Sequence, residues 1–188
     1  MADTQVLFDG VPGAIIYALA GQVSAVVPYA VSGTNSVPVQ VIYQGQASNI
    51  VSVPVSTTIP GIFTSDASGH GQCAIVNQDG IVNTPDNPAP VGSVISLYAT
   101  GEGQTVPDGV DGKPAGYPAP VPVAQPVTAT IGGVSAPVQY AGGAPGEVAG
   151  VMQVNVQIPQ GLSAGSAIPI VIRVGGKNSQ TNVTLAIK

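Results

Sequence analysis

The chain has little charge, no tryptophan and a single cysteine. Charged residues occupy 7% of its 188 positions and only four are basic, whereas an average globular domain has roughly 25% charged residues. With a net charge of −5, the sequence offers no basic cluster for a phosphate backbone or an anionic lipid, which argues against nucleic acid as a partner. Cys73 has no second cysteine to pair with, and a buried, unreactive thiol is expected there.

The chain also lacks any long window of strong helix formers. Its apolar residues are mostly valine, isoleucine and alanine, interrupted by 25 glycines and 18 prolines. Such a composition favours short strands joined by many turns. The apolar stretch 11–31 contains Pro12, Gly21 and Pro28, which predicts strands and a turn and argues against insertion into a membrane.

An internal repeat divides the chain into two copies of one module. Tyr17 matches Tyr140 at an offset of 123 residues, and from Gln22, which matches Gln153, the offset is 131, so the second copy is eight residues longer in that loop. Two diverged copies that agree in this way locate strands and turns better than local propensity does. Further matched pairs are Gly10–Gly133, Ile15–Val138, Pro38–Pro169, Val41–Ile172, Gly45–Gly176 and Ser48–Ser179.

The repeat and the alternation of apolar residues predict an all-β fold of two tandem antiparallel β-sandwich domains. The first is predicted at residues 1–58 and the second at 91–188, with a long loop at 103–126. A connecting segment at 59–90 is predicted to contain a β-hairpin. The strand expected at 93–99 has no counterpart in the first copy. The first domain is therefore expected to lack its opening strand, to present an unpaired edge and to belong to a C-terminal fragment of a longer chain.

Several motifs, in the order in which they occur, resemble a known family. They are Val6–Gly10, Asn77–Gly80, Tyr98–Gly103, Ile131–Gly133, Tyr140–Gly142 and Gln153–Pro159. Together they resemble the acidobacterial Solibacter-type C-terminal domain family, and each half resembles an IPT/TIG immunoglobulin-like domain. The resemblance implies tandem immunoglobulin-like domains at the C-terminus of a larger secreted bacterial protein. That family is itself uncharacterised, so the resemblance assigns no catalytic or ligand-binding residue.

No set of residues in the chain predicts catalysis. His70 is the only histidine and no Gly-x-Ser-x-Gly motif occurs, so a non-enzymatic protein without a cofactor is expected. His70 and Cys73 lack the further ligands that a zinc site needs. Glu102, Asp108 and Asp111 fall in one glycine-rich loop and are candidate calcium ligands, although Asp-Gly pairs also serve as plain turn formers.

The tyrosines bear on glycan binding, because sugar-binding modules commonly stack sugar rings on exposed aromatic side chains. Tyr17 and Tyr140 occupy equivalent repeat positions and are expected in the core. Tyr117, in the long loop, is therefore the candidate aromatic platform. Loops 103–126 and 142–150 would form its surroundings.

These observations predict a non-enzymatic, extracellular structural or interaction module that serves as a spacer, adhesion or assembly domain. Secretion, or display at the cell surface, is expected from the low-charge surface rich in serine, threonine and asparagine. The unpaired edge predicts a protein partner or self-association by strand addition. Two alternatives stay open: a carbohydrate- or polymer-binding module, and an accessory domain of a secreted enzyme whose catalytic part is absent.

Overall fold

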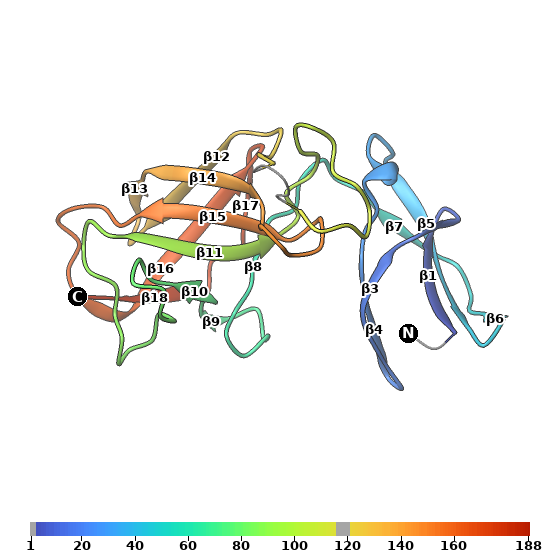
Figure 1. Ribbon diagram of the computed structural model, residues 1–188, viewed down its shortest axis with the longest axis horizontal. Helices are drawn as coiled ribbons and strands as arrows, with labels where there is room; N and C mark the ends of the chain where they lie inside the picture. Colours follow the sequence, from blue (N-terminus) through green and yellow to red (C-terminus); the bar gives the residue numbers. More distant parts are fainter. Residues whose placement is uncertain (1–2, 116–120) are drawn as a thin grey trace.

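The protein is all-β, as its composition predicts, in a computed structural model that describes residues 3–115 and 121–188. Figure 1 shows two lobes, an N-terminal lobe formed by residues 4–54 and a C-terminal lobe formed by residues 61–187. The only helix in the described ranges is one 3-10 turn at Tyr29–Val31. None of the described helices is long and apolar enough to cross a membrane.

The N-terminal lobe contains one sheet and a separate hairpin. Its strands are β1 (Thr4–Phe8), β2 (Val11–Pro12), β3 (Ala14–Leu19), β4 (Gln22–Val26), β5 (Ser36–Tyr43), β6 (Gln46–Ala47) and β7 (Val51–Pro54). In the sheet, β5 pairs with β1 on one edge and with β6 and β7 on the other, and β2 pairs with β1. The hairpin consists of β3 and β4.

The C-terminal lobe contains two larger sheets. Its strands are β8 (Gly61–Ile62), β9 (Gly71–Gln72), β10 (Ile75–Val76), β11 (Val94–Thr100), β12 (Val127–Ile131), β13 (Val134–Ala136), β14 (Val138–Gly143), β15 (Met152–Gln157), β16 (Gly165–Val174), β17 (Lys177–Asn178) and β18 (Val183–Ile187). One sheet has the order β10-β11-β15-β14, with β8 also on β11. The other has the order β13-β12-β16-β18-β9, with β17 also on β16. Both sheets contribute side chains to one shared core.

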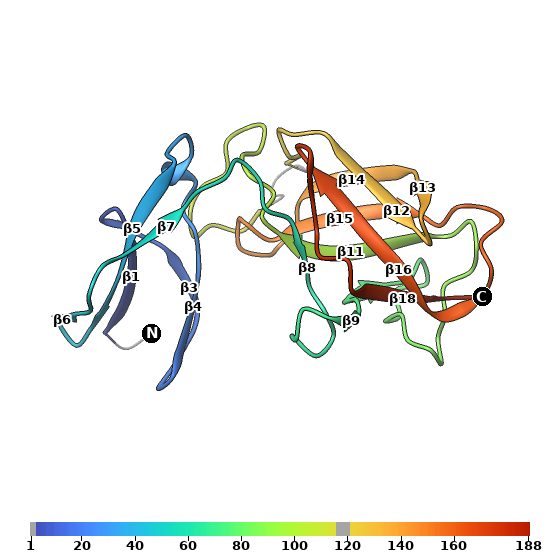
Figure 2. The same cartoon turned by 180° about the vertical axis from the view of Figure 1, so that it is seen from behind.

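Residues 59–90, predicted as a connecting segment, supply β8, β9 and β10 to the sheets of the C-terminal lobe. The expected hairpin turn is present, because Gly80 N–H donates to Asn77 O (2.9 Å) and Gly80 has a φ of +81°, which glycine accommodates without strain. Asn83 is fully buried, and its amide donates to Asn77 Oδ1 and to Ala186 O, both at 2.9 Å. Figure 2 shows the chain crossing from β7 to β8 as a single extended connection before it joins these sheets.

The two lobes repeat one pattern of strand pairing. The strands β1 to β7 correspond in order to β12 to β18, and each pairing in the first set has its counterpart in the second. Both hairpins carry a bulge at matched sites, between Ile15 and Tyr17 in β3 and between Val138 and Tyr140 in β14. Residues matched by the sequence repeat therefore occupy the same positions in the sheets.

A matched pair of serines shows that the repeat extends to side-chain hydrogen bonds. Ser48 Oγ accepts a hydrogen bond from Val41 N–H, and Ser179 Oγ accepts one from Ile172 N–H, both at 3.1 Å. In each lobe this bond ties the residue that follows the short strand (β6 or β17) to the central strand (β5 or β16). The two copies thus share local structure as well as topology.

The lobes differ in the size of their cores. The N-terminal core has four buried residues, whereas the C-terminal core has twenty, drawn from both sheets and from segment 61–100. Among the described residues, the N-terminal lobe has no counterpart of that segment. Cys73 belongs to it and is completely buried, and burial raises the pKa of its thiol, so the predicted buried cysteine is confirmed. The core of the N-terminal lobe is smaller because no described segment packs on it in the way that segment 61–100 packs on the C-terminal core.

Candidate functional site

Strand β4 is paired along one edge only. Among the described residues it pairs with β3 alone, whereas its counterpart β15 lies between β14 and β11. Free edges present backbone N–H and C=O groups to other strands, and many proteins block them with lysine or proline. The sequence of β4, QVSAV, contains neither a charge nor a proline. This edge is therefore open to pairing.

The N-terminal sheet also has an uncovered apolar face. Val53 lies directly opposite Val37 in the sheet, so both side chains point to one face, and Val37 is buried. Yet Val51 and Val53 expose 53% and 41% of their surface. In the C-terminal lobe Leu185 lies opposite Ile168, the repeat match of Val37, so by strand register Val183 and Leu185 take the places of Val51 and Val53. Val183 and Leu185 are both 0% exposed. The N-terminal lobe thus presents core-facing side chains to solvent.

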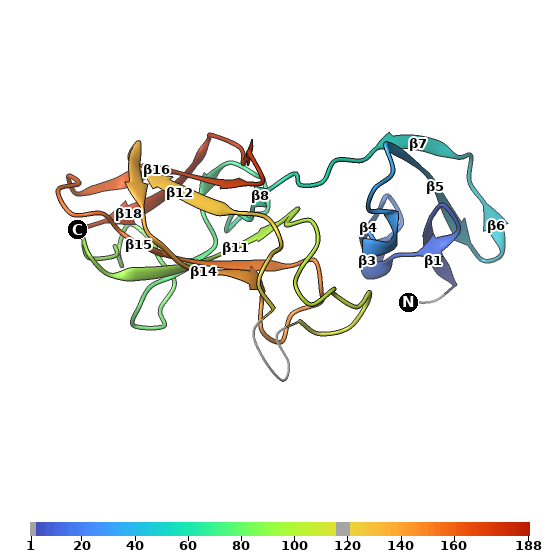
Figure 3. The same ribbon diagram turned by 90° about the horizontal axis from the view of Figure 1, so that it is seen from above.

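A cleft of about 640 Å³ lies between the lobes and reaches the end of β4. Its walls are mainly apolar and come from both lobes and from the connection between them. Seen from above, in Figure 3, the lobes are joined by the extended connection after β7 and approached by the loop that follows β11. The lining includes residues 24–27, 54–59, 100–104 and 147–148.

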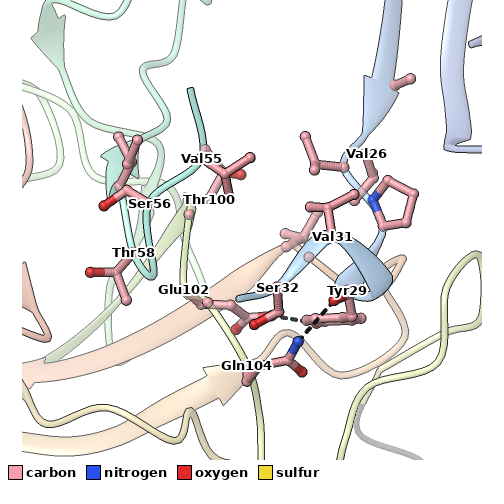
Figure 4. Close-up of a pocket in the computed structure, with 18 of the residues that line it drawn as sticks. Val26, Tyr29, Val31, Ser32, Val55, Ser56, Thr58, Thr100, Glu102 and Gln104 are labelled. Atoms are coloured by element: carbon pink, nitrogen blue, oxygen red, sulfur yellow. Dashed lines mark hydrogen bonds between the residues drawn. The ribbon is translucent and has the colours of Figure 1, made fainter. Parts of the chain in front are cut away.

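Tyr29 joins the two lobes through three hydrogen bonds. Its hydroxyl donates to Glu102 Oε1 (2.8 Å), its N–H donates to Asp111 Oδ1 (2.8 Å), and its carbonyl accepts from Gln104 Nε2 (3.0 Å). Figure 4 shows Tyr29 turned toward Glu102 and Gln104 at the edge of the cleft. Gly109 lies so close to the Tyr29 ring that a Cβ there would clash. The long loop is therefore folded around one residue of the N-terminal lobe.

Glu102 places a buried carboxyl group at this junction. The residue is 2% exposed, and Oε2 has no hydrogen-bond partner among the described residues. Burial raises the pKa of Glu102 above its usual value, and the bond from Tyr29 opposes the shift without cancelling it. Burial and the neighbouring Glu102 raise the pKa of Tyr29, so its hydroxyl keeps the proton that it donates. The junction therefore favours the neutral form of Glu102.

No family model, curated protein or solved structure matches this chain. The resemblance to the Solibacter-type family and to IPT/TIG domains thus stays a prediction. The function has to be argued from the open edge, the uncovered face and the junction.

Removing the Tyr29 hydroxyl is expected to loosen the junction. Tyr29→Phe deletes the donor to Glu102 and leaves a buried carboxyl without it, at a cost of about 1–3 kcal/mol. We expect the radius of gyration from small-angle X-ray scattering to rise while the circular dichroism of the sheets stays unchanged. Tyr43→Phe is the matched control, because Tyr43 is an exposed tyrosine of the same lobe. Identical scattering from the two variants would contradict the role of Tyr29.

Glu102 is also expected to make the stability of the junction depend on pH. Folding raises the pKa of Glu102 above its unfolded value near 4.5. Its stabilising contribution is therefore complete below that pH and is lost as the pH rises through the folded-state pKa. Glu102→Gln keeps the shape and removes the charge, so its melting temperature should fall less than that of the wild type between about pH 4 and pH 8. Calorimetry measures this, with exposed Glu147→Gln as control. If the melting temperatures of Glu102→Gln and the wild type differed by the same amount at every pH, the proposed pH dependence from Glu102 would be contradicted.

The structure brings two of the three calcium candidates to one place. Glu102 and Asp111 both accept hydrogen bonds from Tyr29, while Asp108 is exposed. Within residues 3–115 and 121–188, no group of three or more histidine, cysteine, aspartate or glutamate side chains could hold a metal ion. In the structure Glu102 and Asp111 hold Tyr29 by hydrogen bonds.

The other candidates lie in separate environments. Tyr117 falls outside the described residues. The prediction that Tyr17 and Tyr140 are core residues is wrong, since Tyr17 is 36% exposed and Tyr140 is half-buried with its hydroxyl donating to Gly143 O (2.8 Å). Both follow the bulge of their hairpin, and bulges re-aim the side chains beside them. His70 is exposed in the loop between β8 and β9.

Sequence reasoning missed Tyr29 and Gln104. The long loop predicted at 103–126 carries two of the contacts to Tyr29, from Gln104 and Asp111. A further signal was available, because Tyr29 matches Gln160 at the repeat offset and so has no aromatic counterpart in the second copy. Gln104 had no such signal.

Proposed function

We propose that this chain is a non-enzymatic interaction module whose N-terminal lobe completes its fold by receiving a β-strand from a partner polypeptide. The observation that carries the proposal is the contrast between two equivalent strands. β15 is flanked by β14 and β11, whereas β4 is flanked by β3 alone among the described residues. Strand addition would satisfy the backbone groups of that edge and give affinity through main-chain hydrogen bonds.

The uncovered apolar face supports the same proposal. Val51 and Val53 stay exposed although they point toward the N-terminal core. Covering them removes apolar surface from water, at roughly 25 cal/mol for each Å². A partner that pairs with β4 and covers this face would be held by backbone bonds and by apolar burial together.

The setting that we propose for this module is extracellular. The resemblance to the Solibacter-type family implies a C-terminal, immunoglobulin-like module on a larger secreted bacterial protein, in a spacer, adhesion or assembly role. A surface with 7% charged residues and a net charge of −5 suits contact with protein better than contact with nucleic acid. Strand capture gives such a module a means of assembly.

The proposal is tested with a peptide that copies the strand missing from the N-terminal lobe. The probe is an acetylated peptide with the sequence of residues 93–101, SVISLYATG, titrated into the ¹⁵N-labelled protein. We expect saturable shift changes confined to β4 and its neighbours in the N-terminal lobe. The absence of any saturable change, or changes confined to the C-terminal lobe, would overturn the proposal.

Two matched variants locate the binding. Val53→Lys places a charge on the uncovered face, and Val134→Lys places one at a valine of similar exposure (45% against 41%) in the C-terminal lobe. Both positions are solvent-exposed, so both variants are expected to fold. Val53→Lys should weaken peptide binding, and Val134→Lys should leave it unchanged. Equal binding by both would contradict the assignment of the face.

A further inference from the structure

The C-terminal lobe specifies which kind of strand fits beside β4. β11 runs antiparallel to β15, and the repeat superimposes β15 on β4 residue by residue. From this, and resting on the proposed function, we infer that the partner segment runs antiparallel to β4 and carries apolar side chains at its second, fourth and sixth positions, counted from the residue that takes the place of Val94 in β11. The segment lies outside residues 1–188.

The pairing of β11 fixes the register. In the C-terminal lobe, Ile95 lies opposite Val156 and Leu97 lies opposite Val154. At the repeat offset, Val156 corresponds to Ala25, and Val154 corresponds to Val23. The second residue of the incoming segment therefore lies opposite Ala25 and the fourth opposite Val23. The sixth, in the place of Ala99, falls opposite Gly21, the turn residue that directly precedes β4.

The burial pattern of β11 fixes the chemistry of the segment. Ile95, Leu97 and Ala99 are completely buried, whereas the residues between them are only partly buried. Val23 and Ala25 pack against the N-terminal core, so an incoming strand in the same register aims its alternate side chains at that core. At Gly21 a Cβ would meet nothing within 4 Å, which leaves room for a small apolar side chain opposite it. A segment shifted by one residue would point its apolar set into solvent.

The cleft fixes which end of the segment lies between the lobes. Residues 24–27 line the cleft, so the first residues of an antiparallel segment enter it. Glu102 and Glu147 line the same cleft, and Glu102 Oε2 is a buried acceptor without a partner among the described residues. A hydrogen-bond donor at the start of the segment complements Glu102 Oε2, and a positive charge complements the exposed Glu147. The last residues lie near the β3–β4 turn.

A second copy of residues 1–188 does not supply such a segment. The β11 of another copy is held between β10 and β15 and is completely buried at three positions, so donating it would unfold that copy. The β4 of another copy offers only Val23 and Ala25 to the core face. It cannot supply the three apolar side chains that β11 supplies in the C-terminal lobe.

The register is tested with three forms of the β11 peptide and the intact chain. One form is SVISLYATG, the second is a peptide of the same composition in which Ile, Leu and Ala are consecutive, and the third carries a nitroxide at either end. We expect the peptide with consecutive apolar residues to bind at least about tenfold more weakly, because no register points all three of these side chains to the core face. A label at the first residue should broaden amide signals around Val26 and Tyr29, and a label at the last residue should broaden those around Gly21.

The outcomes separate the inference from the proposed function. Equal binding by the peptide with consecutive apolar residues would overturn the apolar alternation, and labels that broaden the opposite ends would overturn the register, while strand capture would stay intact in both cases. No binding by any peptide would overturn the proposed function. Light scattering across a concentration series adds one check, since a dimer whose formation is abolished by Val53→Lys would assign the site to a second copy and overturn the inference.

Discussion

Val183→Ala is expected to lower the free energy of unfolding of the C-terminal lobe by about 2–3 kcal/mol, because it removes two buried methyl groups and leaves a cavity. Val183 is completely buried, whereas Val51, at the equivalent position of the N-terminal lobe, is 53% exposed. Val51→Ala is the same chemical change, and we expect it to shift stability by no more than about 0.5 kcal/mol. Urea unfolding followed at amide signals of each lobe gives both values.

The pair of variants tests the asymmetry of the two lobes directly. Equal costs at the two positions would mean that Val51 is covered in solution and that the N-terminal lobe has no open face. Val51→Ala should instead reduce binding of the β11 peptide, because the side chain belongs to the face that the peptide covers. Val183→Ala is thus expected to lower stability, and Val51→Ala is expected to lower peptide binding.

Asn83→Ala is expected to destabilise the C-terminal lobe by about 3 kcal/mol, because buried polar groups lose their partners at about 1–3 kcal/mol each. Asn83 Oδ1 accepts from Ala186 N–H (2.8 Å) and from Gln72 Nε2 (2.9 Å), and its amide donates to Asn77 Oδ1 (2.9 Å). The side chain therefore ties segment 59–90 to β18. Thermal unfolding by calorimetry measures the loss.

Asn182→Ala is the matched control for this variant. Asn182 is exposed at the start of β18, so its replacement should change stability by no more than about 0.5 kcal/mol. If Asn83→Ala were as mild as Asn182→Ala, segment 59–90 would be loosely attached. Its three strands would then not belong to the fold of the C-terminal lobe.

The strands could be predicted from the sequence because two copies constrain each other. The strand predicted at 93–99 agrees with β11 within one residue at each end. The matched positions, such as Tyr17 with Tyr140, even locate a shared bulge. Alternation within each strand indicated the buried side, since Val154 and Val156 are completely buried.

The junction and segment 59–90 could not be predicted in this way because they have no second copy. Tyr29 reaches across 73 residues to Glu102 and across 82 to Asp111, and nothing in local periodicity encodes such a contact. Asn83 likewise pairs with a residue 103 positions away. A segment rich in asparagine and proline, as 83–90 is, is typical of a loop, so the sequence favoured a linker where the structure has a buried hydrogen-bond network.

The central claim is that β4 carries a free edge where β15 carries β11. Amide hydrogen exchange by NMR tests it most directly, since paired and unpaired backbone N–H groups differ in protection. In the monomeric protein we expect alternate amides of β4 to exchange at least about 100-fold faster than their counterparts in β15, and the β11 peptide to slow them. Equal protection of β4 and β15 in the free monomer would contradict the open edge and the function proposed from it.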